Sequence, residues 1–347
     1  MPRKTTKAAI LVKQNAPLVL AEVEIPKLDV GQVLVKVAYS SICGKQLDEL
    51  SGKRGDDPYL PHLLGHEGAG IVTDIGPGVR KVKNGDHVVL HWMKGSGIDS
   101  APPRFDWNGA TVSAGWITTF SEYTIVSENR LTPVSPDIKL DILPLLGCAV
   151  TTGLGIVFND LDLKPGQSIA VFGAGGVGLN VLQGAALVNA YPIVAIDLND
   201  RKLEWARTLG ATHTINTSRT NPDAILKELS NGKGFDASVD TTGNTGVFQT
   251  AYNMTGNTGK TVMAGVLHHE KPISIDAFPL HFGRQIIGSH GGNTKPDIDI
   301  PRYIKLYQLG KLKLDEQITH RFRLDDINEG IGIVQKGKAG RCLISMS

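Results

Sequence analysis

The feature that most constrains this chain is a glycine-rich turn between a strand pattern and a helix pattern. The apolar run Ile169–Phe172 leads directly into the G-x-G-x-x-G sequence Gly173, Ala174, Gly175, Gly176, Val177 and Gly178. The first glycine of such a turn permits the tight bend, the second lets backbone approach a pyrophosphate, and the third lets helix and strand pack closely. The following helix N-terminus presents N–H groups and a positive dipole end to phosphates. The sequence therefore predicts a dinucleotide-binding turn.

An acidic residue follows the next strand pattern and narrows the choice of nucleotide. Asp197 ends the run that begins at Ile193 and lies 24 residues after Gly173. A carboxylate there can accept hydrogen bonds from both ribose hydroxyls and would repel a 2′-phosphate, which favours NAD over NADP. The alternative to a dinucleotide site is a βαβ turn with a purely structural role, in which Asp197 is an acidic residue without a function in binding.

Strand and helix patterns alternate from about Leu163 onwards. Strands are expected at 168–172, 193–196, 213–216, 235–240 and 260–266, with helices at 176–190, 201–209 and 223–230. This alternation predicts an α/β fold with a parallel, doubly wound sheet covered by helices on both faces. Further along, a helix is expected at 301–309, a strand at 318–322, a helix from near Asp325, and a strand at 342–346.

The first part of the chain has a different pattern. Short runs rich in β-branched residues, bounded by turn residues, predict strands at 7–12, 33–39, 70–75, 87–91 and 120–126. Residues 92–116 show little periodicity and are expected to form a long loop. The predicted organisation is a β-rich catalytic domain at 1–150, an NAD-binding domain at 151–290, and a segment at 291–347 that returns to the catalytic domain.

Composition excludes several classes of function. With 36 basic and 34 acidic residues, the chain has no broad positive field for nucleic acid. The charge-free stretch between Lys164 and Asp197 contains six glycines and Pro192, so we expect no membrane span. Three scattered cysteines and the lack of a signal-peptide pattern favour a reducing compartment, and we expect a cytoplasmic location.

Two of the cysteines and one histidine form a candidate metal site. Cys43, His66 and Cys148 would give two thiolates and one imidazole, with a fourth position free for water or substrate, as in catalytic zinc sites. Spacing alone leaves the alternative open, because a buried free cysteine commonly acts as a small hydrophobic residue.

Motifs along nearly the whole chain resemble those of the zinc-dependent medium-chain dehydrogenase/reductase family, which includes alcohol and polyol dehydrogenases. The matching segments are 65–70 (GHEGAG), 76–79 (GPGV), 85–88 (GDHV), 120–123 (FSEY), 147–153 (GCAVTTG), 173–178 with Asp197, and 337–341 (GKAGR). The resemblance implies a GroES-like twisted β catalytic domain, a Rossmann cofactor domain, and a homodimer or homotetramer.

The same resemblance implies roles for individual residues. Cys43, His66 and Cys148 would bind the catalytic zinc, with Glu67 beside it. The cofactor-binding residues would be the glycine turn together with Thr152 at the nicotinamide, Asp197 and Lys202 at the adenosine ribose, Val266, and Arg341 at the pyrophosphate.

Two departures from the family pattern affect these expectations. Residues 91–117 contain none of the four cysteines that hold a structural zinc in many members, so one zinc per chain is expected. After Cys43, family members usually carry Ser or Thr two residues on and Asp one further, but here those places hold Lys45 and Gln46. The usual hydroxyl relay and carboxylate are therefore in doubt, and Asp48 is a candidate substitute for the carboxylate.

Lys45 has three alternative roles. Burial and a nearby metal would lower its pKa and make it a general base. A charged Lys45 could instead hold a carboxylate or phosphate of the substrate, or it could point to solvent. Gln46 is assigned to the substrate pocket.

The substrate is inferred from the segment after the 87–91 run. Trp92 and Trp116 are placed at the pocket by the resemblance, and the same inference uses His91, Met93, Lys94, Arg104 and Trp107. Several donors would suit a polar hydroxylated substrate such as a polyol or sugar derivative, oxidised with NAD. The alternatives are simple alcohols, aldehydes or thiol adducts of formaldehyde, and a catalytically silent NAD-binding protein.

Overall fold

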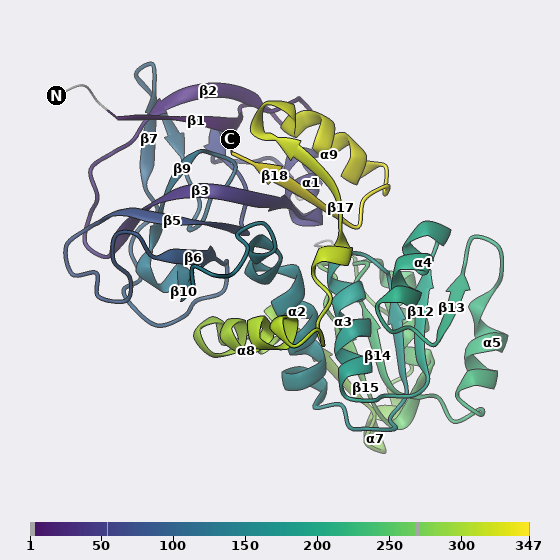
Figure 1. Cartoon of the computed structure of the whole chain (residues 1–347). Helices are drawn as coiled ribbons and strands as arrows, with labels where there is room; N and C mark the ends of the chain where they lie inside the picture. The colour runs from purple at the N-terminus through teal and green to yellow at the C-terminus, as the bar shows by residue number, and fades with distance from the viewer. Residues whose placement is uncertain (1–3, 54, 268–270, 347) are drawn as a thin grey trace. The chain divides into compact units, whose positions relative to one another are not determined.

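The computed structural model describes residues 4–53, 55–267 and 271–346 and divides into two compact units (Figure 1). The first, here called the β-rich unit, comprises residues 1–148, 295–309 and 314–347. The second, the α/β unit, comprises residues 149–294 and 310–313. Each unit has its own sheet and its own apolar core.

The α/β unit contains a six-stranded parallel sheet in the order β13-β12-β11-β14-β15-β16. This strand order reverses direction between β11 and β14, which is the Rossmann arrangement with its ligand-binding switch point. The strands are β11 (Ile169–Phe172), β12 (Ile193–Asp197), β13 (His213–Asn216), β14 (Phe235–Asp240), β15 (Thr255–Met263) and β16 (Gln285–Gly288). The α/β fold expected from the alternating patterns is therefore confirmed.

The sheet is buried on both faces. Ile169 and Val171 of β11 belong to one apolar cluster, while the alternate residues Ala170 and Phe172 belong to another. Such burial explains why these strands are continuous apolar runs.

Helices surround the sheet, and asparagine side chains begin three of them. The helices are α2 (Ala149–Gly155), the π-helical η3 (Ile156–Leu161), α3 (Gly176–Leu187), α4 (Asp200–Thr208), α5 (Pro222–Leu229), α6 (Thr245–Asn253), α7 (Phe278–His281) and the short η4 (Gly291–Asn293). Asn199, Asn221 and Asn244 each accept a backbone N–H of the first turn of α4, α5 and α6, as N-cap residues do. The sequence patterns do not predict α2 and α6.

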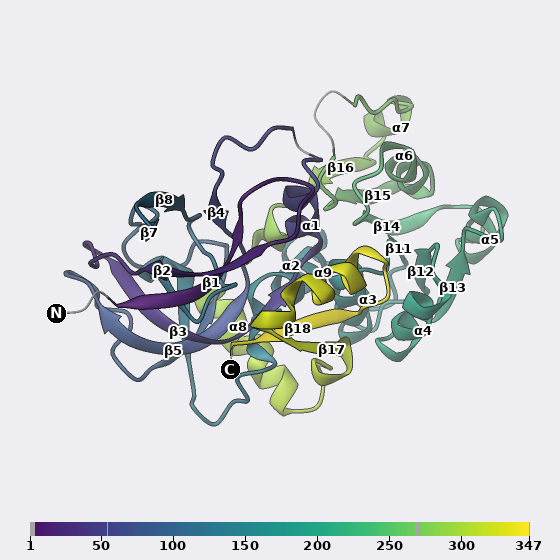
Figure 2. The ribbon, with the colours of Figure 1, turned by 90° about the horizontal axis from the view of Figure 1, so that it is seen from above.

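The β-rich unit contains a seven-stranded sheet and a closed barrel. The sheet has the order β10-β6-β5-β3-β18-β17, with β9 also paired to β3, and the barrel has the order β1-β2-β7-β8-β4 (Figure 2). The strands are β1 (Thr5–Leu11), β2 (Val19–Glu24), β3 (Gln32–Ile42), β4 (His62–Leu63), β5 (Gly68–Ile75), β6 (His87–Leu90), β7 (Arg104–Trp107), β8 (Ala110–Ser113), β9 (Tyr123–Ser127), β10 (Leu131–Val134), β17 (Ile318–Arg323) and β18 (Arg341–Ser345).

The segment near the C-terminus contributes two strands, β17 and β18, to the seven-stranded sheet that contains β3. β18 pairs antiparallel with β3, and α9 packs on these strands through Ile327 and Ile331. The helical segments of this unit are α1 (Gly44–Leu50), η1 (Glu128–Arg130), η2 (Leu143–Gly147), α8 (Pro296–Gln308), η5 (Asp315–Gln317), η6 (Leu324–Asp326) and α9 (Ile327–Gln335).

The expectation of a long loop at 92–116 is wrong in part, because β7 and β8 form a hairpin there. Asn108 and Gly109 join the two strands, both with positive φ (55° and 86°), and Asn-Gly is a strong signal for such a two-residue turn. Phe105 and Val112 oppose each other and are buried in the barrel. The hairpin was missed because its strands are only four residues long.

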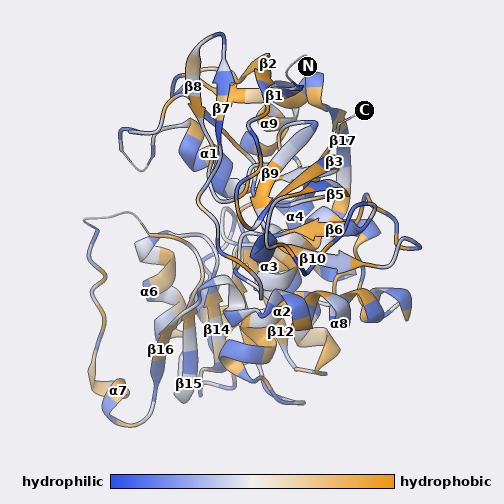
Figure 3. Ribbon diagram, turned by 90° about the vertical axis from the view of Figure 1, so that its left-hand side faces the viewer, coloured by the Kyte–Doolittle hydropathy of each residue, from blue (hydrophilic) through white to orange (hydrophobic). Residues whose placement is uncertain are grey.

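Apolar residues follow the strands of the β-rich unit. In Figure 3, β6 and β9 are coloured as hydrophobic, and their residues Val88, Leu90, Ile125 and Val126 are buried. Within the ranges that the structure describes, no helix has the length and apolar character needed to cross a bilayer.

Candidate metal and cofactor sites

The β-rich unit brings together three residues that are distant in sequence. Cys43 follows the end of β3, His66 lies just before β5, and Cys148 follows η2. Pairing of β3 with β5 aligns the first two segments, and close packing of Gly147 on Glu67 aligns the third; a Cβ at position 147 would lie 2.8 Å from Cβ of Glu67. The two Sγ atoms and a ring nitrogen of His66 lie within 4.8 Å of one another.

This donor set fits a zinc ion. Two cysteines and one histidine are typical zinc ligands, and three protein ligands leave a position for a reactant. Nε2 of His66 is buried and has no hydrogen-bond partner among the described residues, which is unusual for a buried polar atom. The residues therefore provide a site that a metal ion would complete.

The electrostatics of the cluster also favour a cation. A hydrogen bond from Cys148 holds the pKa of Cys43 well below its ordinary value, although burial opposes this. The same bond, with burial, raises the pKa of the Cys148 thiol. Burial is the largest single effect and would lower the pKa of His66, but Cys43, Glu67 and Glu49 together outweigh it and the net shift is upward. The raised pKa values of His66 and Cys148 favour their protonated forms, and a metal ion bound to these residues would displace the protons.

A buried ion pair lies next to the cluster. Glu67 is fully buried and accepts a hydrogen bond from Arg341, whose guanidinium also donates to Oγ of Ser41 at 2.6 Å. Burial raises the pKa of Glu67 to about 7, against the opposing effect of Arg341. The structure therefore places Arg341 on Glu67, and its contact with a pyrophosphate stays a prediction.

Gln46 contacts the metal cluster itself. It is buried in the first turn of α1, where its Oε1 accepts the backbone N–H of Cys43 at 2.9 Å and its Nε2 contacts Nδ1 of His66. Its side chain is therefore engaged with two of the three candidate ligand residues.

Lys45 lacks the burial on which its role as a general base depended. Its side chain is 48% exposed, and Nζ forms an ion pair with Oε1 of Glu49 at 2.9 Å. Asp48 pairs with Lys53 at 3.3 Å, so its carboxylate is engaged there. The structure thus places Lys45 in an ion pair at the surface, and its role among the three alternatives stays a prediction.

Trp92 and Trp116 lie close to an arginine that the sequence patterns did not reveal. The guanidinium carbon of Arg130 lies 5.6 Å from the ring centre of Trp116, and the same side chain donates to the backbone carbonyl of Trp92. Trp92 packs partly buried on the core cluster of β6, whereas Trp116 is 59% exposed. No motif pointed to Arg130, because its burial depends on the packing of the β-rich unit.

The other residues expected to make a polar pocket do not converge. Lys94 is exposed and paired with Asp99, Arg104 is exposed on β7, and Trp107 packs on the barrel core. His91 is buried; it donates from Nδ1 to the carbonyl of Met93 at 2.7 Å, and burial lowers its pKa to about 4. These donors are therefore engaged elsewhere or face solvent.

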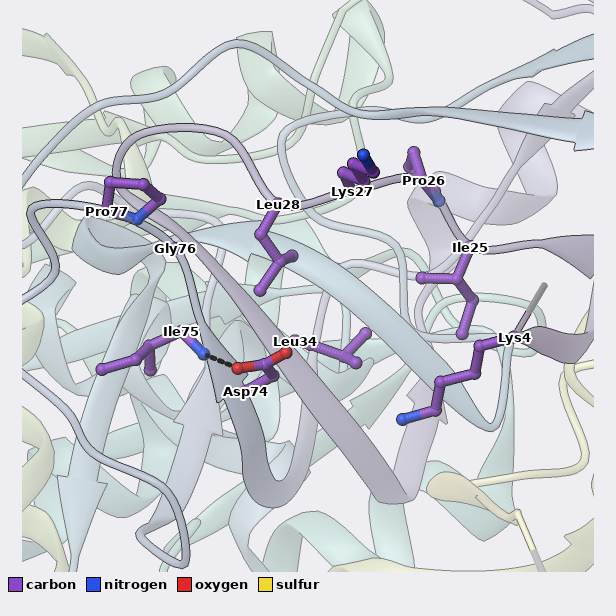
Figure 4. A pocket seen from close by; sticks show the side chains of 10 residues that line it. All are labelled: Lys4, Ile25, Pro26, Lys27, Leu28, Leu34, Asp74, Ile75, Gly76 and Pro77. Atoms are coloured by element: carbon purple, nitrogen blue, oxygen red, sulfur yellow. Dashed lines mark hydrogen bonds between the residues drawn. The ribbon is translucent and has the colours of Figure 1, made fainter. Parts of the chain in front are cut away.

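A surface hollow of about 290 Å³ lies elsewhere on the β-rich unit (Figure 4). The side chains of Ile25, Leu28 and Leu34 form its apolar wall, and Asp74 accepts the backbone N–H of Ile75 at its edge. Its lining includes none of the expected site residues, so we assign it no role in the chemistry.

In the α/β unit, the glycine turn fits a dinucleotide. Gly173 has φ +94°, and a Cβ on Gly178 would lie 1.8 Å from the carbonyl oxygen of Gly173, so both positions need glycine. A Cβ on Gly175 would meet nothing within 4 Å, which leaves open space at the N-terminus of α3. Asp197 is fixed at this turn by the backbone N–H of Ala174 at 2.7 Å.

The remaining cofactor candidates lie on separate elements of the same unit. Thr152 is buried in α2, Val177 is partly buried in α3, and Lys202 is partly exposed on α4. Val266 is 67% exposed, and its carbonyl lies next to Gly243, where a Cβ would approach it to 2.4 Å.

Comparison with known proteins decides the family. Residues 29–136 match the model of the alcohol dehydrogenase GroES-like domain, and residues 176–308 match that of the zinc-binding dehydrogenase. The chain is 34% identical to an S-(hydroxymethyl)glutathione dehydrogenase of Synechocystis, over 98% of this chain and 99% of that protein. The chain belongs to the zinc-dependent medium-chain dehydrogenase family. The resemblance seen in the sequence motifs and the GroES-like and Rossmann folds are thereby confirmed.

Solved structures of this dehydrogenase family match over almost the full length. The crystal structure of benzyl alcohol dehydrogenase from Acinetobacter calcoaceticus has a TM-score of 0.90 at 30% identity, covering 99% of this chain and all of that one. The structure of 2R,3R-butanediol dehydrogenase from Bacillus subtilis has a TM-score of 0.80 at 27% identity, with the same coverage. The chain is thus an oxidoreductase of the alcohol dehydrogenase type, and its Cys-His-Cys cluster could hold a metal ion.

Proposed function

We propose that this protein is an NAD-dependent alcohol dehydrogenase whose catalytic zinc is held by Cys43, His66 and Cys148. The observation that carries the proposal is the convergence of these three donor atoms within 4.8 Å in the β-rich unit. A catalytically silent member of the family would have no need of a complete ligand set. The intact cluster therefore favours an active enzyme.

The chemistry follows from the groups at the site. When bound, zinc acts as a Lewis acid that lowers the pKa of an alcohol and polarises a carbonyl. The two cysteine sulfurs provide negative charge for the ion, and Gln46 holds His66 through Nδ1. A bound NAD, held by the glycine turn and Asp197, would supply the acceptor for a hydride from the carbinol carbon, and the hydroxyl proton would pass to solvent. The reverse reaction takes up the same hydride and proton.

Asp197 supports NAD as the cofactor. Its Oδ2 is fixed by Ala174 and its Oδ1 accepts the N–H of Asn199 at 3.0 Å, so the carboxylate is held at the glycine turn. A fixed carboxylate binds ribose hydroxyls and repels a 2′-phosphate. Thr152, Lys202 and Val266 are proposed as further cofactor contacts.

Two classes of substrate compete for the site. The polyol or sugar derivative expected from the sequence is supported by the name of the butanediol dehydrogenase relative. However, Lys94 and Arg104 do not converge on a common pocket, so they no longer support this class. Simple or aromatic alcohols and thiol adducts of formaldehyde are supported by the names of the other two relatives and by the aromatic rings of Trp92 and Trp116. We therefore place the second class first.

The test is a screen of NAD reduction with zinc supplied. It compares benzyl alcohol, short primary alcohols and S-(hydroxymethyl)glutathione with diols, polyols and sugar derivatives. Higher kcat/KM for the first group supports simple or aromatic alcohols and thiol adducts as the preferred class, and higher kcat/KM for polyols favours the other class. If protein that is shown to contain zinc reduces NAD with none of these alcohols, the proposed function is contradicted.

Self-association through the α/β unit is a further part of the proposal. β16 is an edge strand of the sheet, and the side chains of Phe278, Leu280 and Phe282 just before it are exposed. Exposed apolar side chains beside an edge strand are typical of an interface. A homodimer or homotetramer thus remains the expected state, and the cytoplasm remains the expected location.

A further inference from the structure

The side chain of Thr241 lies against the glycine turn of the α/β unit. Thr241 follows β14 directly, and its backbone N–H donates to the carbonyl of Phe172 at 2.9 Å, which continues the pairing of β14 with β11. Its hydroxyl donates to the carbonyl oxygen of Gly173 at 2.9 Å. The carbonyl oxygen of Phe172 lies 3.1 Å from the hydroxyl but already accepts the backbone N–H. The hydroxyl therefore serves mainly the carbonyl of Gly173.

Two glycines of the turn leave the space that this hydroxyl occupies. A Cβ on Gly173 would lie 2.6 Å from Oγ1 of Thr241, and a Cβ on Gly178 would lie 3.2 Å from it. Among the residues that the structure describes, no backbone N–H donates to the carbonyl oxygen of Gly173. The hydroxyl of Thr241 is thus the protein donor for this group, and a backbone carbonyl that loses its donor away from water is costly.

The peptide bond that joins Gly173 to Ala174 is held from both sides. The carbonyl and the N–H of a trans peptide point in opposite directions within one plane. Here the carbonyl accepts from Thr241, while the N–H of Ala174 donates to Oδ2 of Asp197 at 2.7 Å. Thr241 follows β14 and Asp197 ends β12, and these two strands flank β11 in the sheet. The outer strands thus fix the first peptide of the turn that leaves the central one.

The neighbouring residue Asp240 fixes the chain on which Thr241 lies. Asp240 is fully buried, and its carboxylate accepts the backbone N–H and the hydroxyl of Thr242 at 3.0 and 2.6 Å. The same carboxylate accepts the N–H of Gly243 at 3.2 Å. The segment after β14 is therefore tied to a buried anchor, which keeps Thr241 against the turn.

We propose that Thr241 is a positioning residue that, together with Asp197, fixes the orientation of the Gly173–Ala174 peptide for dinucleotide binding. The inference rests on the NAD site of the proposed function and adds a residue that lies outside the glycine motif. A turn that is ordered before a dinucleotide arrives loses less conformational freedom on binding, so it binds more tightly. In this role Thr241 affects the affinity for the cofactor and leaves the chemical step unchanged.

The first experiment measures the dissociation constant of NADH by fluorescence titration. Thr241→Val keeps the branched shape and removes the hydroxyl, so we expect NADH to bind about tenfold more weakly. The value of kcat at saturating NAD should change by less than about threefold, because the chemical step is not affected. Thr241→Ser keeps the hydroxyl and should bind NADH within about threefold of wild type. Unchanged affinity in Thr241→Val, or an equal loss in both variants, would overturn the proposal.

Thr255→Val is the matched control in the same unit. The hydroxyl of Thr255 is buried and donates to the carbonyl of Ala251 at 2.9 Å. Thr255 begins β15, so it lies at the opposite end of the parallel sheet from the glycine turn. Its replacement should lower stability while the affinity for NADH stays within about twofold of wild type. A loss of affinity as large as that in Thr241→Val would indicate a general effect of a missing hydroxyl and would overturn the positioning role.

The second experiment follows the turn itself and needs neither cofactor nor activity. Hydrogen–deuterium exchange, read by mass spectrometry on peptides that cover residues 169–180, reports how well the N–H of Ala174 is protected. We expect faster exchange in these peptides in Thr241→Val and exchange like that of wild type in Thr255→Val. Unchanged exchange of the turn in Thr241→Val, or an equal rise throughout the unit, would contradict the proposal.

The outcomes separate the role of Thr241 from the NAD site. A wild type that binds NADH while Thr241→Val binds it equally well overturns the role of Thr241 alone. A wild type that binds no NADH at concentrations up to about 1 mM overturns the NAD site of the proposed function, and with it the role of Thr241 in binding.

Discussion

The buried carboxylate of Glu128 accepts the backbone N–H of Ile98 at 2.8 Å, across 30 residues of sequence. Its other oxygen accepts the N–H groups of Arg80 and Lys81, each at 2.6 Å. One side chain thus joins three backbone sites, and one of them, Ile98, lies in the 91–117 segment that has no cysteine. The loop is held by a carboxylate together with the ion pair of Lys81 and Asp297.

Replacement of Glu128 by Gln should lower the free energy of unfolding by about 2 kcal/mol at pH 7, because hydrogen bonds to a charged group are lost. Burial opposes ionisation, but the three N–H donors hold the pKa of Glu128 below its ordinary value. Because its pKa is lowered in the folded protein, ionised Glu128 stabilises the fold at pH values above the pKa of a glutamate in the unfolded chain, about 4.3. This contribution is lost as the pH falls further. Urea unfolding should show a smaller difference in the free energy of unfolding between wild type and variant at about pH 3.5 than at pH 7. Asp137→Asn, at an exposed site, is the control; an equal loss there would contradict the prediction.

Metal analysis should find one zinc per chain. Cys148→Ala removes one ligand and should abolish turnover while NAD binding, followed by fluorescence quenching, stays within about threefold, because Cys148 and the glycine turn lie in different units. Two zinc ions per chain, or full activity in the variant, would contradict this expectation.

Asp197→Gly should reduce the preference for NAD over NADP by about 10–100-fold, since it removes charged hydrogen bonds to the ribose and the repulsion of a 2′-phosphate. The measurement is kcat/KM for each cofactor. Asp200→Asn, which changes the charge on the adjacent helix, should leave the ratio nearly unchanged. An equal effect in both variants would indicate a general effect of charge.

Lys45→Met should change kcat by less than about threefold and leave the basic limb of the pH–rate profile in place, because the exposed, paired Lys45 lacks the burial that a general base would need. If KM rises only for anionic substrates, Lys45 is an anchor for them. A large loss of kcat with the basic limb displaced would restore the general-base hypothesis.

Phe278→Ser combined with Phe282→Ser should shift the protein to a smaller species in analytical ultracentrifugation if α7 is part of the subunit interface. The centroids of the two rings lie 5.0 Å apart, and both side chains are largely exposed. Unchanged sedimentation, with the wild type an oligomer, would place the interface elsewhere.

The sequence predicted the α/β unit well because strands buried on both faces, such as β11, are continuous apolar runs that local pattern reveals. It predicted the β-rich unit less completely: the hairpin at Asn108 and Gly109 has short strands, although its turn signal was present. The environment of Gln46 was beyond local pattern, because it depends on His66 lying 20 residues away. The burial of Arg130 likewise depends on packing between segments distant in the chain.

The pairing of β18 with β3 has a consequence for synthesis on the ribosome. Residues 149–294, which form nearly all of the α/β unit, are translated as one block and can fold as soon as that block emerges. The sheet around the metal ligands must wait about 300 residues after β3 for β18, which also brings Arg341 to Glu67. Until then Glu67 lacks its counter-charge, so a stalled or shortened chain would have a folded α/β unit and an incomplete candidate metal site.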